Sequence, residues 1–335
     1  ASDVYKRQTQ KYKAVCKVRS RVRFALTGTP VENRLGELWS IFSFLMPGYL
    51  PPYKSFCSRF EKPIVQEEDQ TAVRRLNQLT GPFILRRMKS DVLKELPPKT
   101  ENVYRIELEE EQRKLYLAAV VDAREKLKAA KPEDKMAVFA VLMRLREICC
   151  DPRLIADNWE GGSAKLDACA ELVSSAVEGG HRILLFSQFT SMLELLAKRL
   201  DAEGISHFTL QGSTPKPVRA ELVRRFNGGE VSVFLISLRA GGTGLNLTAA
   251  DIVIHYDPWW NVAAQNQATD RAYRIGQQNP VQVYKLIAQD TIEEKIVELQ
   301  QAKQSLADTV TGTADGAILS MRPDELLQLL EGSEP

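Results

Sequence analysis

The chain has 335 residues, 44% of them hydrophobic and 26% charged, with a formal net charge of +2. This is an ordinary globular composition, long enough for two domains, and any nucleic-acid contact would have to come from local basic patches. Five cysteines without a CxxC pair and three scattered histidines argue against a disulfide framework and a metal cluster, and no apolar run approaches the ~18 residues of a membrane span. The sequence therefore favours an intracellular, cytoplasmic protein, associated with the nucleoid if it is bacterial.

The first hundred residues predict short helices separated by proline breaks. Residues 24–28 (FALTG) form an apolar run that predicts a strand ending in a Thr-Gly turn. The following TPVEN predicts a helix with Thr29 as its N-cap, which prolines 47–52 then end. Residues 94–101 (KELPPKTE) carry two prolines and no apolar period, so they predict a linker.

Residues 107–150 predict helix, and from residue 181 short apolar runs alternate with helical patterns. The runs are 183–186, 205–210, 231–236, 252–256 and 281–287, and helices are expected at 191–203, 216–227, 261–275 and 291–306. Ser191 and Thr291, each followed three residues later by glutamate, predict two capping boxes. Alternation of apolar strands with helices predicts an α/β fold, a parallel sheet with helices on both faces.

The turns that follow these strands are rich in small, hydroxyl and amide residues. Ligands of parallel sheets bind at the carboxyl ends of the strands, where backbone N–H groups in glycine turns can bind anions. The turns contain Ser187-Gln188, then Gly212-Ser213-Thr214, then the segment 237–246 (SLRAGGTGLN), then residues 257–261 (DPWWN). Capping and connector roles for the same residues remain open alternatives.

The segment 267–277 (QATDRAYRIGQ) predicts a polar helix stripe. With Asn261 as the N-cap and Gly276 as the stop, Gln267, Asp270, Arg271 and Arg274 would share one helix face. Two neighbouring guanidinium groups can bind a polyanion through forked hydrogen bonds, whereas the alternative is a solvated face on which Asp270 pairs with Arg274.

The chain lacks the motifs that hold a β-phosphate and magnesium. Leu247 stands where a GxGxxG fingerprint would need glycine, and no GxxxxGK[ST] occurs in the sequence. The arginines and glycine turns therefore predict half of a phosphate site, whose other half, with most of the magnesium ligands, would come from another domain or chain.

Six ordered stretches resemble the SWI/SNF-type branch of the superfamily 2 helicase-like ATPases. They are 26–33 (LTGTPVEN), 85–101, 183–193 (ILLFSQFTSML), 210–227, 234–261 and 267–277, and the resemblance covers about residues 20–306. Members of this family are ATP-dependent translocases on double-stranded DNA with two RecA-like lobes. The resemblance implies that this chain is a carboxy-terminal fragment with ATP and Mg²⁺ bound between the lobes, and compact motif spacing favours a bacterial member.

The resemblance also implies roles for individual residues. Arg271 and Arg274 would be catalytic arginine fingers, and Thr27, Gly28 and Thr29 would couple nucleotide to DNA. The nucleotide-binding residues implied are Gln267, Asp270, Gly242, Gly244 and Asn246. The DNA-binding residues implied are Ser187, Gln188, Gly212, Ser213, Ser237, Arg239, Ala240, Gly241 and Trp260. No metal-ligating residue is expected in the chain itself.

The expected domain organisation follows from these matches. Residues 1–93 would end the first lobe, 94–101 would link the lobes, 102–160 would be a helical insertion, 161–290 the RecA-like second lobe, and 291–335 a brace helix and tail. The expected function is translocation on duplex DNA with remodelling of DNA-bound protein, by a monomer. A strand-separating DNA or RNA helicase and a stand-alone, non-hydrolysing binding lobe remain alternatives, because they share the fold.

Overall fold

The computed structural model describes residues 10–26, 35–67, 69–85, 87, 93, 95–131, 134–156, 158–241, 244–307 and 323–331. The chain divides into two compact units: Ala1–Lys94 with Gln300–Gly316, and Glu95–Leu299 with Ala317–Pro335. Among the described residues, no helix combines the length and apolarity that crossing a bilayer requires.

The first unit is helical. Its elements are α1 (Gln10–Cys16), α2 (Leu35–Leu45), α3 (Tyr53–Phe56), the π-helix η2 (Cys57–Glu61), α4 (Lys62–Gln66), α5 (Gln70–Thr80) and the 3₁₀ helix η3 (Gly81–Phe83). A small apolar core joins α2, α3, η2, α4 and α5, and in it Leu38, Phe42, Phe56 and Leu76 are buried. The Asp69 carboxylate caps α5 by accepting from the backbone N–H groups of residues 71 and 72.

The second unit is built on a six-stranded parallel sheet with strand order β1-β6-β5-β2-β4-β3. The strands are β1 (Lys99–Ile106), β2 (Ile183–Ser187), β3 (His207–Leu210), β4 (Val233–Ser237), β5 (Ile252–His255) and β6 (Val281–Ala288). Strands β2, β4 and β5 are buried along their full length, which explains their continuous apolar sequences. The predicted α/β fold with a parallel sheet is confirmed.

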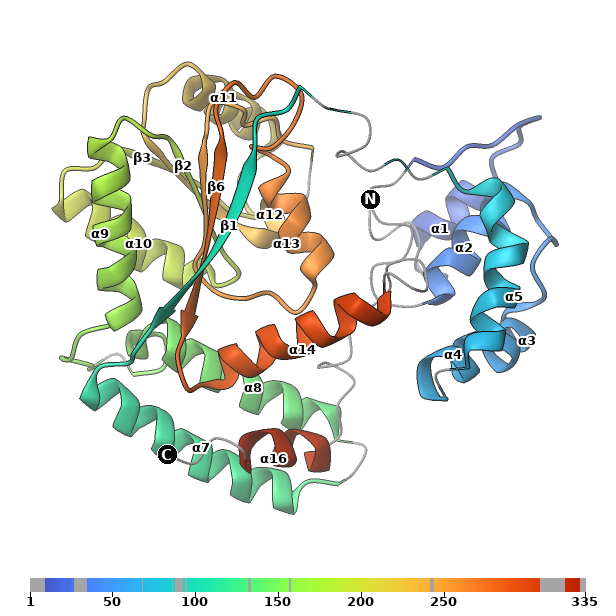
Figure 1. Cartoon of the computed structure of the whole chain (residues 1–335), viewed down its shortest axis with the longest axis horizontal. Coiled ribbons are helices and arrows are strands. Elements are labelled where there is room, and N and C mark those ends of the chain that lie inside the picture. The colour runs from blue at the N-terminus through green and yellow to red at the C-terminus, as the bar shows by residue number, and fades with distance from the viewer. Residues whose placement is uncertain are drawn as a thin grey trace. The chain divides into compact units, whose positions relative to one another are not determined.

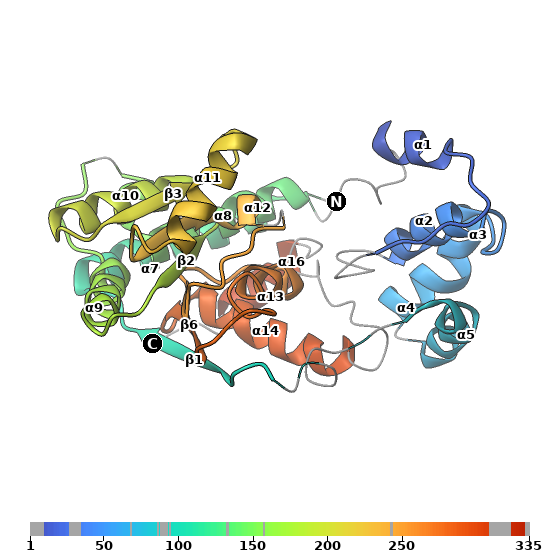
Figure 2. The same ribbon diagram turned by 90° about the horizontal axis from the view of Figure 1, so that it is seen from above.

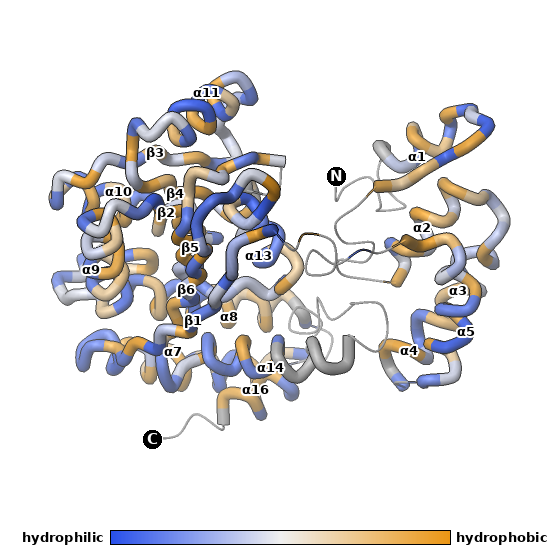
Figure 3. Tube along the Cα trace, turned by 45° about the horizontal axis from the view of Figure 1, so that its top comes forward, coloured by the Kyte–Doolittle hydropathy of each residue, from blue (hydrophilic) through white to orange (hydrophobic). Residues whose placement is uncertain are grey.

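Helices cover both faces of this sheet (Figures 1 and 2). On one face, Leu185, Leu235 and Ile254 pack with the helices α9 (Ala164–Glu178) and α10 (Thr190–Ala202). On the other, Phe186, Phe234 and the neighbouring strand residues pack with α11 (Lys216–Asn227), α12 (Leu238–Gly241) and α13 (Val262–Thr269). Successive strand residues point to opposite faces, so each strand contributes to both cores. Figure 3 shows the apolar stretches along the central strands.

A third core belongs to a helical subdomain. Helices α7 (Glu110–Ala129) and α8 (Lys135–Cys150), the start of α14 (Ile292–Ala307) and α16 (Pro323–Glu331) pack together, and the 3₁₀ helix η4 (Pro152–Leu154) follows α8 in the chain. The buried ion pair between Lys165 of α9 and Glu293 of α14 joins this subdomain to the sheet layer. Thr291 Oγ1 accepts the N–H of Glu293 at 3.2 Å, so the predicted start of α14 is confirmed. The predicted capping box differs in detail, because the Glu294 carboxylate accepts the N–H of Asp290.

Three sequence-based expectations are wrong in detail. Residues 99–101 were predicted to lie in the linker but form the start of edge strand β1, which pairs with β6. Prolines 97 and 98, which have no N–H to donate, come before the paired residues and so do not interrupt the ladder. The described part of the predicted strand at 24–28 has no strand partner. Ser191 is not an N-cap, because α10 begins one residue earlier, at Thr190, with Phe189 at the cap.

Candidate functional site

The carboxyl ends of four neighbouring strands bring the predicted site residues to one edge of the sheet. In the parallel ladder, Ser187 at the end of β2 lies beside Ser237 at the end of β4. On the other side of β2, Phe186 pairs with His255, so the turn after β5 follows next to the turn after β2. The expectation that these turns share an edge is confirmed.

The turn after β2 is held by a buried carboxylate. Ser187 donates its hydroxyl hydrogen to Asp257 Oδ1 at 2.5 Å, and the Gln188 backbone N–H donates to the same oxygen at 3.2 Å. Ser187 Oγ also accepts the N–H of Phe189 at 3.2 Å. Ser187 is therefore fully buried and acts as a turn residue in this conformation, while Gln188 is half-buried. The sequence does not reveal this use of Asp257, because the two turns are 70 residues apart.

The turn after β3 is exposed at Gly212 and Ser213 and is braced from behind. Arg219 of α11 donates to three of its carbonyl oxygens, on Gln211, Gly212 and Thr214, at 3.1, 2.8 and 2.8 Å. These bonds use the carbonyls and leave the outward side of the loop open. Sequence reasoning missed Arg219, although an arginine in the first turn of the following helix is a usable signal.

The turn after β4 begins with the short helix α12. Ser237 Oγ accepts the N–H of Ala240 at 3.3 Å and so starts this helix, in which the backbone of Arg239 and Gly241 also lies. Gly242 lies outside the described residues. Gly244 has φ +53°, a left-handed conformation that glycine adopts without strain, and Asn246 is exposed.

The helix that carries the arginine segment is shorter than the sequence predicts. Asn261 is its N-cap, accepting the Ala264 N–H at 2.6 Å, but α13 ends at Thr269. Asp270 is the C-cap, and Arg271 and Arg274 lie in the turns that follow. The expectation that Gln267, Asp270 and both arginines share one helix face is therefore wrong. At the end of the helix the regular i→i−4 pattern breaks: the N–H groups of Arg271 and Ala272 donate three residues back, and that of Arg274 donates two residues back.

Two hydrogen bonds nevertheless join the arginine segment to the glycine segment after β4. The N–H of Leu247 donates to the carbonyl of Arg271 at 3.0 Å. Arg274 Nη1 donates to the carbonyl of Leu245 at 3.2 Å. The structure thus brings Arg271 and Arg274 beside the segment 244–247, which contains the predicted nucleotide-binding residues Gly244 and Asn246.

Arg271 is a buried cation with an unsatisfied donor. Its side chain is 7% exposed, and its Nε–H is buried without a hydrogen-bond partner in the described part of the chain. Burial lowers the pKa of Arg271, the charge of Arg274 lowers it further, and Asp270 opposes both effects. Buried guanidinium donors are usually paired, so this arrangement has the chemistry of a site that accepts an anion.

Gln277 fixes the end of the same segment and was not predicted as a site residue. Its Nε2 donates to the carbonyls of Ala250 and Ala272 at 2.7 and 3.2 Å. Its Oε1 accepts the N–H groups of residues 278 and 279, both at 2.9 Å. A buried amide with four bonds ties the turn around Arg274 to the loop before β5.

Trp260 is buried, whereas a side chain that contacts DNA would be exposed. Its ring is 8% exposed and packs under the Arg146 guanidinium, whose carbon lies 4.2 Å from the ring centroid. The indole therefore belongs to the core of the helical subdomain in this conformation. A direct DNA contact by Trp260 stays a prediction and requires the ring to leave this place.

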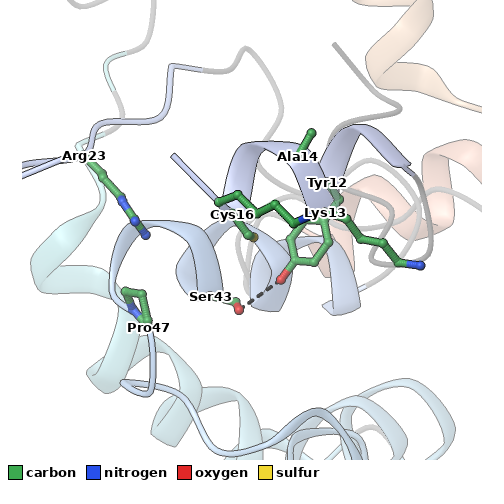
Figure 4. A pocket seen from close by; sticks show the side chains of 8 residues that line it. Tyr12, Lys13, Ala14, Cys16, Arg23, Ser43 and Pro47 are labelled. Atoms are coloured by element: carbon green, nitrogen blue, oxygen red, sulfur yellow. Dashed lines mark hydrogen bonds between the residues drawn. The ribbon is translucent and has the colours of Figure 1, made fainter. Parts of the chain in front are cut away.

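The predicted coupling residues Thr27, Gly28 and Thr29 lie outside the described residues. The segment before them turns apolar side chains outward: Val22, Phe24 and Leu26 are 66%, 83% and 97% exposed. A hollow of about 670 Å³ in the same unit is lined by Tyr12, Lys13, Arg23 and Ser43, among others (Figure 4). The Arg23 guanidinium donates to the carbonyls of residues 44 and 18, so this hollow does not present it as an anion site.

A parallel sheet whose carboxyl edge carries glycine turns and an arginine pair defines a RecA-like helicase lobe. Comparison with family models gives the same class: residues 1–154 match the SNF2-related domain, and residues 164–276 match the helicase conserved C-terminal domain. The chain belongs to the SWI2/SNF2 family of helicase-like ATPases.

Solved structures support this assignment. The Sulfolobus solfataricus SWI2/SNF2 ATPase core in complex with double-stranded DNA matches 96% of this chain and 69% of its own, with 34% identity and a TM-score of 0.60. A second solved structure, of the Sulfolobus solfataricus SWI2/SNF2 ATPase core domain, matches 97% of this chain and 68% of its own, with 35% identity and a TM-score of 0.60.

Curated relatives are longer. An "uncharacterized ATP-dependent helicase" of Mycoplasma genitalium is 40% identical over 95% of this chain and 31% of its own length. The human SWI/SNF-related matrix-associated actin-dependent regulator of chromatin subfamily A member 1 is 37% identical over 93% of this chain and 31% of its own. The chain thus spans about a third of the length of these relatives.

Proposed function

We propose that this chain supplies the arginine side of an ATP site and one side of a duplex-DNA site in an ATP-driven DNA translocase. The observation that carries the proposal is the buried Arg271 guanidinium, whose Nε–H has no hydrogen-bond partner among the described residues, beside a second arginine. A triphosphate would satisfy that donor and offset the repulsion between the two guanidinium groups.

The residues present fit the phosphate end of a nucleotide. Arg271, Arg274 and the glycine segment at 244–246 would hold it. Gln267, Asp270 and Gly242 would belong to the same nucleotide site. ATP with Mg²⁺ supplies the phosphoanhydride bond whose hydrolysis drives movement, and the arginines would stabilise charge that develops on the transferred phosphoryl group. The magnesium ligands and the phosphate-binding loop would come from a partner lobe.

Support for a partner lobe comes from the first unit. Val22, Phe24 and Leu26 expose apolar side chains at alternate positions, and exposed apolar side chains that lie close together are typical of a surface that packs against another part of a protein. The residues Thr27–Thr29 that follow would then couple the nucleotide to DNA. Residues 94–98 would allow the lobes to move relative to each other.

The proposed DNA side is the row of turns after β2, β3 and β4. The exposed residues Gly212 and Ser213 and the start of α12 would offer backbone N–H groups and hydroxyls, which suit phosphate oxygens. Gln188 would contribute its side-chain amide, because its backbone N–H is bonded to Asp257. The proposed DNA site also includes residues that shape these turns or lie within them: Ser187, Ser237, Arg239, Ala240 and Gly241. Support comes from a relative of the same family, the Sulfolobus core, whose solved structure is a complex with double-stranded DNA.

The test uses the parent polypeptide, meaning the longest natural polypeptide that contains this chain. We expect Mg²⁺-dependent ATP hydrolysis that duplex DNA stimulates, with DNA translocation seen by triplex displacement and no separation of strands. Strand separation would support the alternative of an unwinding helicase. DNA binding without any hydrolysis would support the non-hydrolysing lobe and contradict the proposal. We also expect the parent protein to be monomeric and to act on protein–DNA complexes in the cytoplasm or nucleoid.

A further inference from the structure

Arg146 of helix α8 is fully buried where the helical subdomain meets the sheet. Its Nη2 lies 3.4 Å from Asp257 Oδ2 and also donates to the carbonyl of Pro258. The guanidinium lies over the ring of Trp260, at 4.2 Å, and 5.6 Å from the ring of Phe189. One side chain of the subdomain thus contacts the turns after both β5 and β2.

Asp257 connects Arg146 to the turn after β2, which belongs to the proposed DNA site. The same carboxylate that faces Arg146 accepts the Ser187 hydroxyl at 2.5 Å and the Gln188 N–H at 3.2 and 3.4 Å. These bonds set the backbone of the turn that carries the Gln188 side chain, whose Nε2 is buried without a hydrogen-bond partner in the described part of the chain. The chain of contacts runs from α8 through one buried carboxylate to the edge of the sheet.

Burying the Arg146–Asp257 ion pair costs desolvation free energy, so the pair contributes little to the stability of the core. Both side chains are fully buried, and Nε and Nη1 of Arg146 have no hydrogen-bond partner within the described residues. Buried ion pairs seldom stabilise more than apolar residues of the same volume would, and one use of such pairs is to select a single geometry. Burial raises the pKa of the Asp257 carboxyl, and Arg146 counteracts that effect, so loss of the guanidinium would favour a protonated carboxyl that accepts fewer hydrogen bonds.

We propose that Arg146 is a positioning residue for DNA binding: through Asp257 it fixes the Ser187–Gln188 turn in the geometry that contacts duplex phosphates. The helical subdomain therefore sets the shape of the DNA-binding edge without touching DNA. This inference rests on the proposed function, because it assumes that the turn after β2 contacts DNA.

The experiment measures binding of a fluorescein-labelled 20-base-pair duplex to the 335-residue chain by anisotropy at fixed salt. We expect Arg146→Met to weaken binding roughly tenfold, the size of about one lost contact, and Arg146→Lys to restore part of it. The matched control is Gln112→Leu, a fully buried side chain of the same subdomain that donates to the Ile148 carbonyl of α8 and does not contact Asp257. It should lower the melting temperature but leave the Kd within about twofold.

A double-mutant cycle separates positioning from loss of stability. If Arg146 acts through the turn, adding Arg146→Met to Gln188→Ala should weaken binding much less than it does in the wild type. If Arg146→Met does not fold, the same cycle is run with Arg146→Lys. Unchanged binding in the folded Arg146 variants, additive losses, or an equal loss in Gln112→Leu would overturn the inference while leaving the proposed function intact. A wild-type chain that does not bind duplex DNA would instead refute the proposed DNA edge itself.

Discussion

Arg274 donates a hydrogen bond from Nη1 to the carbonyl oxygen of Leu245, at 3.2 Å. The bond crosses 29 residues of sequence and joins the arginine segment to the glycine segment after β4. Together with the bond from the Leu247 N–H to the Arg271 carbonyl, it makes these two segments one structural unit. A shift of one would displace the other, which suits a site that closes around a phosphate chain.

Gln277 should be required for that unit. Replacing Gln277 with alanine leaves the buried carbonyls of Ala250 and Ala272 without their donor, so we expect a loss of about 1–3 kcal/mol in the free energy of unfolding. Urea denaturation of the chain, followed by circular dichroism, measures this. Gln278→Ala is the matched control, because its side chain is exposed, and it should change stability by less than about 0.5 kcal/mol. Equal effects of the two substitutions would contradict this role.

We expect Arg219 to fix the conformation of the loop after β3, which belongs to the proposed DNA site. Arg219→Ala removes its bonds to the carbonyls of Gln211, Gly212 and Thr214, and we expect the Kd for duplex DNA to rise about three- to tenfold. Arg224→Ala removes the same charge from an exposed position on α11 that pairs with Glu221, so it controls for general electrostatics. Anisotropy titrations of both variants at one salt concentration make the comparison. A similar change in both would show that the loop geometry does not matter.

His255 should make stability depend on pH. It is buried, bonds to Thr269 Oγ1 at 2.9 Å, and burial, with help from the Lys285 charge, lowers its pKa to about 3. The unfolded chain binds a proton near pH 6.5, so between pH 6.5 and 3 the unfolded state holds more protons than the folded state. Stability is therefore lost as pH falls through this window, by on the order of a few kcal/mol in total.

The measurement compares urea unfolding of wild type and His255→Gln from pH 7 to 5. Glu101 acts only at lower pH: burial would raise its pKa, but hydrogen bonds from Lys285 and Lys99 lower it to about 2, so its contribution is lost as pH falls below about 4.5. We expect a shallower slope of stability against pH in His255→Gln. An identical slope in the two proteins would show that His255 is not the titrating group.

The sequence predicts the sheet well and the site geometry less well. The continuous apolar runs predict the strands, and the glycine and polar residues after them predict the turns at the carboxyl edge of the sheet. Both signals lie within a few residues of the element that they predict. The end of α13 at Thr269 has no signal in the neighbouring sequence, because no glycine or proline lies between Asn261 and Gly276. The hydrogen bonds of Thr269 with His255 and of Arg271 with Leu247 come from distant parts of the sequence. For the same reason the sequence does not reveal Arg146, whose partner Asp257 is 111 residues away.

The most direct test of the account is DNA-stimulated ATP hydrolysis by the parent polypeptide carrying Arg271→Ala or Arg274→Ala. Each variant should lose turnover by about 10³-fold or more, since the guanidinium groups would stabilise charge on the transferred phosphoryl group, while duplex binding persists. Arg224→Ala, which removes an exposed charge, should hydrolyse ATP at nearly the wild-type rate. Unchanged turnover in both arginine variants would contradict the claim that this chain completes an ATP site.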